Sequence, residues 1–233
     1  MLDGIKEKRL RTEADFQYGR KQYKSALRKY LLLLELSLKN KWVPKQALYH
    51  EKVGDCYEKL DHKKKEDLDR DHENAGKHYV NAARIYSSQS EYGKAAEVYE
   101  KGALAFEEVG RHKDAAEFYL NSGIMFIDIG DLFNASYTIQ KAAKYYEQDK
   151  EYEKAGGAYV KAATLDMRVR DKASAALNFT RAAKDYEKVK NLEKAIECYA
   201  NAAELQSLES VSYTHLRAHE TVLDLVCRLL LEK

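Results

Sequence analysis

Alanine recurs at an unvarying interval of twenty residues, and this repeat constrains the fold more than any other feature of the chain. Around each alanine the same template returns, with an aromatic residue at offset four, two small residues at offsets seven and eight, and usually a second aromatic residue at offset eleven. Ile139, Asp166 and Gln206 are the exceptions at the aromatic positions. Self-similarity at a fixed period is the signature of a repeat architecture. The repeated alanines are Ala75, Ala95, Ala115, Ala135, Ala155, Ala175 and Ala195.

The spacing within each repeat is helical. Offsets 0, 4, 7, 8 and 11 fall within one stripe of about 100° on an α-helix of roughly 3.6 residues per turn. Small residues admit a neighbouring backbone and rings fill the space beside it. The intervening polar segments 107–114, 127–134 and 147–154 are short, with Gly110 and Gly130 suited to helix C-caps, so successive helices run antiparallel. We predict an all-α, right-handed α-solenoid of antiparallel helical hairpins, with about twenty residues per helix.

Three helices are predicted before the strict repeat begins. Residues 23–39 and 44–60 each form one helix in this interpretation, the second with Pro44 in its first turn, and Ala14–Tyr18 belongs to an earlier one. The charge-dense segment 61–73 is either a solvated connection or a helix start. A single proline and 33% charged residues agree with a helical class.

The repeat stops abruptly after residue 210. Its phase predicts an alanine at 215, an aromatic residue at 219 and a small one at 222, where the chain has His215, His219 and Val222. A solenoid normally ends in a polar-faced capping helix, and the segment Val211–Lys233 is instead similar to translated sequencing-adaptor reads. We expect a truncated helical-repeat domain over residues 1–210 and a non-native tail over 211–233.

Charge and motifs argue against several classes of function. The 40 basic and 38 acidic residues nearly cancel, so no chain-wide field favours nucleic acid or an anionic membrane. No glycine-rich phosphate loop follows a strand, and no carboxylates are set apart by an apolar setting. We predict no catalytic residue, no cofactor and no small-molecule substrate. His215 and His219 share a helix face beside Glu220, but they lack further ligands and predict no metal site.

The cysteines and the apolar segments indicate the compartment. Cys56, Cys198 and Cys227 are too scattered for a disulfide framework or a zinc site, and we expect buried, reduced thiols and a cytoplasmic location. The apolar cluster at 30–38 contains Glu35 and is too short to span a bilayer.

A second signal lies six residues after each repeated alanine, about 240° around the helix and away from the apolar stripe. Alternate helices there carry Lys101, Lys141 and Arg181. We call these three residues the basic ladder, since helices of one set are expected side by side, roughly 10 Å apart. The intervening helices carry Lys161, a further basic candidate, and a polar row of Asn81, Asn121 and Asn201. Either these residues contact a partner, or they form an ordinary solvated face.

The residues from Trp42 to Ala203 resemble the soluble NSF attachment proteins. The similarity is carried by the "KNKW" before a helix, by "NAGKHYVNAARIY", by "AAEVYEKGALAFEEVGRHKDAAEFY" and by "ASYTIQKAAKYYEQ". Tetratricopeptide repeats have a shorter period of about 34 residues and a proline near the repeat end. The forty-kilodalton huntingtin-associated protein is a second relative by architecture.

The resemblance implies a non-enzymatic adaptor of vesicle trafficking that binds bundled SNARE helices through basic residues and recruits an NSF-type ATPase to dismantle them. The alternative is a scaffold that stabilises a large partner, as the huntingtin-associated protein does. In the family a loop near the N-terminus touches membranes, whereas residues 15–24 here are mostly polar, so peripheral membrane association stays open. The family's C-terminal bundle, which contacts the ATPase, has no counterpart in this sequence.

Overall fold

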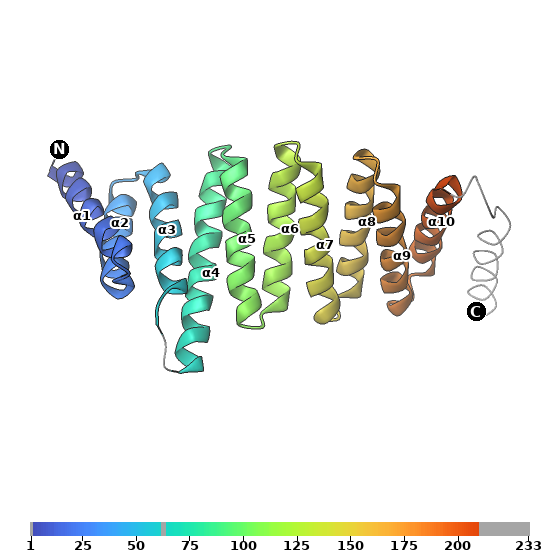
Figure 1. Cartoon of the computed structure of the whole chain (residues 1–233), viewed down its shortest axis with the longest axis horizontal. Coiled ribbons are helices and arrows are strands. Elements are labelled where there is room, and N and C mark those ends of the chain that lie inside the picture. The colour runs from blue at the N-terminus through green and yellow to red at the C-terminus, as the bar shows by residue number, and fades with distance from the viewer. Residues whose placement is uncertain (1, 62–63, 210–233) are drawn as a thin grey trace. The chain divides into compact units, whose positions relative to one another are not determined.

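The computed structural model describes residues 2–61 and 64–209, all of whose regular elements are helices (Figure 1). The segment 211–233, with its histidine pair and Cys227, lies outside the described residues. The helices are α1 (Leu2–Gly19), α2 (Tyr23–Lys39), α3 (Val43–Glu58), α4 (Lys65–Ser88), α5 (Tyr92–Glu108), α6 (His112–Asp128), α7 (Leu132–Gln148), α8 (Tyr152–Arg168), α9 (Lys172–Lys188) and α10 (Leu192–Glu209).

Two compact units divide the chain at residues 129 and 130, so that one holds α1–α6 and the other α7–α10. Within each unit every helix packs against the next one in sequence. Ion pairs also link alternate helices: Arg111, at the start of α6, lies 2.7 Å from Glu73 of α4, and Lys188 of α9 lies 3.7 Å from Glu147 of α7. Each unit is therefore an α-solenoid of helical hairpins in two layers, as the repeat predicts.

The apolar stripe of each repeat forms the core. All seven repeated alanines are fully buried, together with most of the rings at offsets four and eleven. Small residues sit under these rings: a Cβ on Gly76 of α4 would lie 2.7 Å from the ring of Phe106 in α5. No larger residue fits there without displacing the ring. The core is thus set by pairing a small residue on one helix with a large one on the next.

The connections between helices are shorter than the sequence predicts. Except between α3 and α4, only three residues separate consecutive helices in the described chain. At Lys150 the backbone has φ 58° and its N–H donates to the carbonyl of Glu147, while Glu151 N–H donates to the carbonyl of Tyr146. This is the Schellman motif, which satisfies the free carbonyls of a helix end. Glu151 is also the N-cap of α8, so one turn ends a helix and begins the next.

The left-handed residue recurs at the same place in the other three-residue connections. Gly110 and Gly130 have φ of 71° and 80°, which confirms their expected role as helix C-caps. The remaining connections use a side chain at this position: Lys21, Lys41, Ser90, Lys150, Arg170 and Lys190. The cations among them lie beside the negative end of the preceding helix dipole, which favours a positive charge.

A tyrosine–glutamate hydrogen bond also repeats every forty residues. Tyr159 of α8 donates to Glu147 of α7 at 2.9 Å. The same bond joins Tyr119 to Glu107 in the first unit, at 3.0 Å, and Tyr199 to Glu187 in the second, at 3.1 Å. It pairs offset four of one helix with offset twelve of the helix before it, so the repeat carries a polar fastening as well as an apolar core.

Candidate protein-interaction surface

The residues at offset six are distributed over both units. Lys101 lies on α5 of the first unit, and Lys141 and Arg181 lie on α7 and α9 of the second. All three are partly buried, whereas Lys161 on α8 and Asn81 on α4 are exposed. That these three cations bind one partner stays a prediction.

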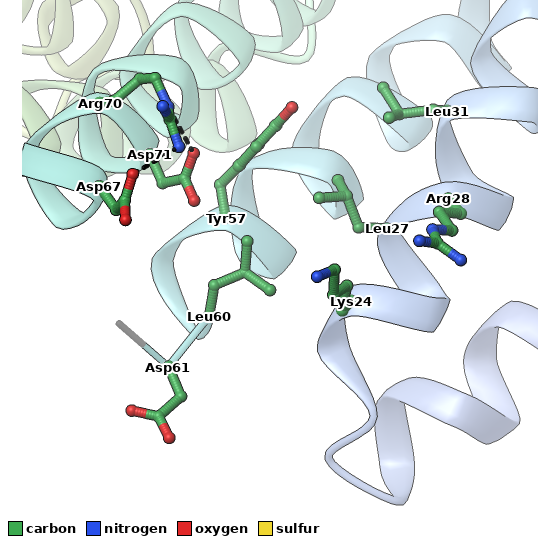
Figure 2. A pocket seen from close by; sticks show the side chains of 10 residues that line it. All are labelled: Lys24, Leu27, Arg28, Leu31, Tyr57, Leu60, Asp61, Asp67, Arg70 and Asp71. Carbon is green, nitrogen blue, oxygen red and sulfur yellow. Dashed lines mark hydrogen bonds and ion pairs between the residues drawn. The ribbon is translucent and has the colours of Figure 1, made fainter. Parts of the chain in front are cut away.

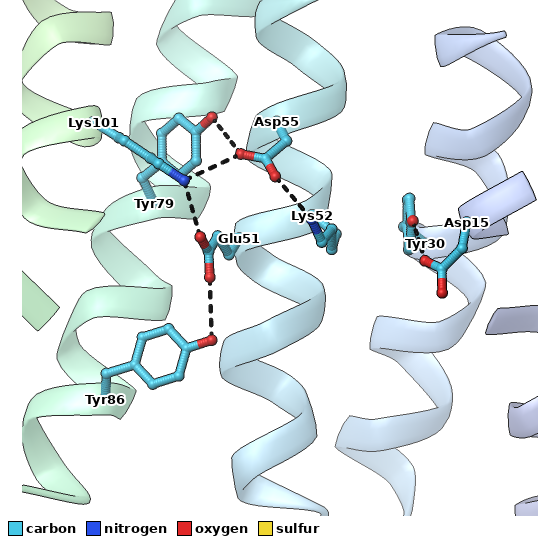
Figure 3. Close-up of polar contacts among 8 residues, drawn as sticks. All are labelled: Asp15, Tyr30, Glu51, Lys52, Asp55, Tyr79, Tyr86 and Lys101. Atoms are coloured by element: carbon cyan, nitrogen blue, oxygen red, sulfur yellow. Dashed lines mark hydrogen bonds and ion pairs between the residues drawn. The ribbon is translucent and has the colours of Figure 1, made fainter. Parts of the chain in front are cut away.

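Lys101 is held within a polar network between α3, α4 and α5 (Figure 3). Its Nζ lies 2.9 Å from Glu51 Oε1 and 3.5 Å from Asp55 Oδ1. Tyr79 donates to Asp55 at 3.0 Å and Tyr86 to Glu51 at 3.2 Å. Burial opposes the charge of Lys101, but the hydrogen bond to Glu51 and the charges of both carboxylates raise the pKa of Lys101 above its usual value. The charge of Lys101 is thus matched inside the molecule.

Lys141 and Arg181 lie against aromatic faces, as Lys101 does against Tyr79, where Nζ is 5.6 Å from the ring centroid. The Nζ of Lys141 lies 4.9 Å from the ring centroid of Tyr137, and Cζ of Arg181 lies 5.7 Å from that of Tyr159. In the described part of the chain, no carboxylate lies within ion-pairing distance of Arg181. Such contacts orient a cation without neutralising it. Arg181 therefore keeps a charge that a partner can bind.

The polar row also lacks internal partners. Over residues 2–61 and 64–209, the side chains of Asn81, Asn121 and Asn201 make no hydrogen bond. Asn121 and Asn201 are half-buried. Each amide keeps two N–H donors and a carbonyl oxygen for solvent or for a partner.

Sequence reasoning missed a set of apolar residues beside these cations. Phe133 and Tyr137 of α7 are 71% and 54% exposed, and Leu177 of α9 is 51% exposed. Tyr137 and Leu177 both stand at offset two of their repeats, outside the apolar stripe. The sequence contains a sign of this surface, because two large apolar residues stand at the same offset on the polar face of the repeat. In the second unit, α7 and α9 thus present apolar and cationic side chains together.

Two buried carboxylates of the second unit are structural. Asp166 stands where most repeats have a ring; it accepts from Asn178 at 2.7 Å and also bonds Ser136. Asp185 is fully buried with Lys188 2.8 Å away. Burial raises the pKa of Asp185 to about 6, against the opposing effect of Lys188. Asp166 thus joins α8 to α7 and α9 across the core, whereas Asp185 pairs within α9 with Lys188, which also reaches Glu147 of α7.

The described residues contain no group of three or more histidine, cysteine or acidic side chains able to hold a metal ion. None of their helices has the length and apolarity needed to cross a membrane. Cys56 and Cys198 are buried and unpaired, and burial raises their pKa values to about 12 and about 11.

The first helix exposes more apolar surface than the polar segment 15–24 suggests. On α1, the side chains of Leu2, Ile5 and Phe16 are 84%, 68% and 62% exposed.

Comparisons with known proteins identify relatives of this arrangement. A family model described as "Soluble NSF attachment protein, SNAP" matches residues 45–151 and again 128–211, which is more than half of the chain. No curated protein sequence matches.

Among solved structures, the chain is similar to BtubC (BKLC) from P. vanneervenii, with 14% identity, coverage of 91% of this chain and 93% of that one, and a TM-score of 0.43. It is also similar to a putative kinesin light chain with nearly identical TPR-like repeats from Podosopora anserina, with 13% identity, coverage of 88% and 99%, and a TM-score of 0.45. At these identities the likeness concerns the helical-repeat fold alone.

Proposed function

Because this chain belongs to the soluble NSF attachment protein family, we propose that it is a non-catalytic adaptor of vesicle trafficking. In this role it binds SNARE helical bundles and recruits an NSF-type ATPase that dismantles them. The family match across residues 45–151 and 128–211 carries the proposal. Such an adaptor works in the cytoplasm, with peripheral contact to the membranes where its partners reside.

The second unit offers the most suitable contacts for an acidic helical bundle. Arg181 keeps its charge over an aromatic ring, Lys141 lies beside Tyr137, and Lys161 is exposed on α8. The apolar side chains on α7 and α9 suit the aliphatic parts of the same helices. Lys101 contributes less in this proposal, because Glu51 and Asp55 already match its charge. Asn81 and Asn121 of the first unit and Asn201 of the second are proposed as residues that form hydrogen bonds to a partner.

The charge-reversed variant K141E/R181E tests this role. We expect its affinity for a purified SNARE bundle to fall about tenfold at low salt, since each contact becomes repulsive. The matched control is K150E/K190E, which makes the same charge change at two turn positions in the same unit. If both variants lose the same affinity, the loss is caused by the net charge of the chain and not by the proposed contact. If K141E/R181E loses no affinity, the proposed contact is refuted.

Recruitment of the ATPase is measured separately. Purified chain, SNARE bundle and NSF-type ATPase are mixed with a non-hydrolysable ATP analogue and separated by sedimentation. We expect the ATPase to co-sediment only when both other components are present. If the chain binds neither and instead retains a single large helical-repeat protein from cell extract, the scaffold role takes the place of this proposal.

A further inference from the structure

The first unit departs from the regular repeat at the start of α4. Helices α5 to α10 begin three residues before their repeated alanine, but α4 begins at Lys65, ten residues before Ala75. The seven additional residues form about two further turns, and they lie beyond the ends of α3 and α5 (Figure 1). These turns place Asp67, Arg70 and Asp71 opposite α2.

A pocket of about 570 Å³ opens between these turns, the end of α3 and one face of α2 (Figure 2). Its apolar lining comes from Leu27 and Leu31 of α2 and from Tyr57 and Leu60 at the end of α3. Leu27 is nearly buried, while Leu31 is 37% exposed. The pocket therefore has an apolar floor that is open to solvent.

The two walls of this pocket carry opposite charge. Lys24 and Arg28 of α2 form one wall, and Asp61, Asp67 and Asp71 form the other. Arg70 lies 3.0 Å from Asp67 and 3.9 Å from Asp71, so it offsets part of the acidic wall. Lys24 and Arg28 are exposed, and neither forms an ion pair with any residue that the structure describes. Lys24 and Arg28 therefore lie across the pocket from the three aspartates without forming ion pairs with them.

The apolar floor continues along α2. A second hollow of about 550 Å³ shares Arg28 and Leu31 with the first and extends over Leu32 and Leu38. These two leucines are 52% and 53% exposed. From Lys24 to Leu38 the continuous surface, which we call the α2 groove, runs about 20 Å, or four helical turns. Contiguous exposed apolar surface of this kind marks interaction sites on soluble proteins.

We propose that the α2 groove binds an amphipathic helix of a partner protein, about four turns long. The apolar stripe of that helix packs on the leucines of α2, and its two polar flanks have opposite charge. Acidic residues on one flank pair with Lys24 and Arg28, and basic residues on the other face the aspartates at the end of α3 and the start of α4. In helix-in-groove binding of this kind, the bound helix inserts apolar side chains at positions i, i+3, i+4 and i+7.

The charges of the two walls favour an amphipathic helix over a membrane surface as the occupant of the α2 groove. A lipid surface rich in anionic headgroups suits the α2 wall but is repelled by the three aspartates and by Glu35, which also lines the second hollow. A helix with one acidic and one basic flank satisfies both walls. The groove also shares no residue with the proposed SNARE contact, whose main residues Lys141, Lys161 and Arg181 lie on α7, α8 and α9.

Three synthetic peptides test the proposal with the whole chain. Each is a fluorescein-labelled helix of about four turns with the same leucine stripe; the first has one glutamate flank and one lysine flank, the second two lysine flanks and the third two glutamate flanks. We expect the mixed peptide to bind about tenfold more tightly than the others in fluorescence anisotropy. The preference should diminish as salt screens the walls.

The variant K24E/R28E makes both walls acidic, so the two-lysine peptide should become the tightest ligand. The control K6E/K8E makes the same charge change on exposed residues of α1 and should leave the order of the peptides unchanged. In L31S/L32S all three peptides should bind more weakly while the circular dichroism spectrum is retained, because both leucines are exposed.

Four results would overturn the proposal. Equal binding of the three peptides would remove the role of the walls, and so would an unchanged preference in K24E/R28E. A dimer in sedimentation velocity that K24E/R28E abolishes would assign the groove to a second copy of the chain. Binding to anionic vesicles that the same variant abolishes would assign it to a membrane. None of these outcomes depends on SNARE binding, so this proposal can fail independently of the adaptor role.

Discussion

The imidazoles of His50 and His78 meet between α3 and α4, with their Nδ1 atoms 2.9 Å apart. Tyr57 stacks on His78, with ring centroids 5.9 Å apart. One ring must donate and the other accept, so the contact is satisfied when both are neutral. Burial lowers the pKa of His50, and burial together with the charge of His50 lowers the pKa of His78 to about 4.

This pair makes the stability of the first unit depend on pH. Because the pKa of His78 is lower in the folded than in the unfolded chain, its contribution is complete above pH 6.5 and is lost as the pH falls towards 4. We expect His78 to cost about 2 kcal/mol of unfolding free energy at pH 5 relative to pH 7.

Urea denaturation at the two pH values measures the effect. Asp185 has the opposite influence, since its raised pKa favours the folded state as the pH falls. The comparison is therefore made between the wild-type chain and the variant H50Q/H78Q, which keeps Asp185. An identical pH dependence in both would show that the histidines do not cause it.

At the scale of the element, the three-residue connections define where each helix ends. Side chains at their left-handed position cost about 1–2 kcal/mol in backbone energy compared with glycine. At Gly110 nothing lies within 4 Å of the position that a Cβ atom would take, so any effect of a side chain there comes from the backbone. The turns thus differ in strain while sharing one hydrogen-bond pattern.

Substitutions at this position should change stability in opposite directions. We expect Lys150→Gly to raise the free energy of unfolding by about 0.5–1 kcal/mol and Gly110→Ala to lower it by about 1 kcal/mol. Lys150→Ala is the control that removes the charge but keeps the Cβ, and it should not stabilise. Chemical denaturation of the three variants decides the matter; a destabilised Lys150→Gly would mean that the lysine charge at the helix end outweighs the strain.

The helices themselves could be predicted because their stripe repeats, and each repeated alanine is buried in the expected place. The lengths of the connections could not, because the Schellman hydrogen bonds keep polar residues such as Glu107 and Glu108 helical. The ion-pair partners of Lys101 could not be predicted either, since Glu51 and Asp55 lie about fifty residues earlier in the sequence, outside the strict repeat. The α2 groove depends on extra turns of α4 that follow no period.

At the scale of the whole molecule, the alternation of layers makes two helices the smallest interchangeable unit. Removing residues 152–191 deletes α8 and α9 and joins Glu151 to α10. Glu147 occupies the offset of Glu187, so Tyr199 would donate to Glu147 in the shortened chain. The packing and the hydrogen bond are therefore both conserved by a deletion of forty residues.

We expect that deletion to leave a helical chain with a cooperative thermal transition, lower by about 5 °C because nearest-neighbour contacts are lost. Deleting only residues 152–171 is the matched test. It places α9 where α8 belongs, so the layers no longer alternate, and the cooperative transition should be lost. Circular dichroism melting of both chains distinguishes the two cases; equally cooperative melting would show that the helices are interchangeable singly.

The basic residues in the left-handed turns also determine how a protease meets the folded chain. Trypsin cleaves after lysine and arginine, and exposed turns are the preferred sites of nicking in folded proteins. Lys150, Arg170 and Lys190 stand twenty residues apart, whereas the preceding turns present Ser90, Gly110 and Gly130 instead. Limited digestion would accordingly release fragments one helix long from the second unit, while the left-handed positions between α4 and α7 carry no lysine or arginine.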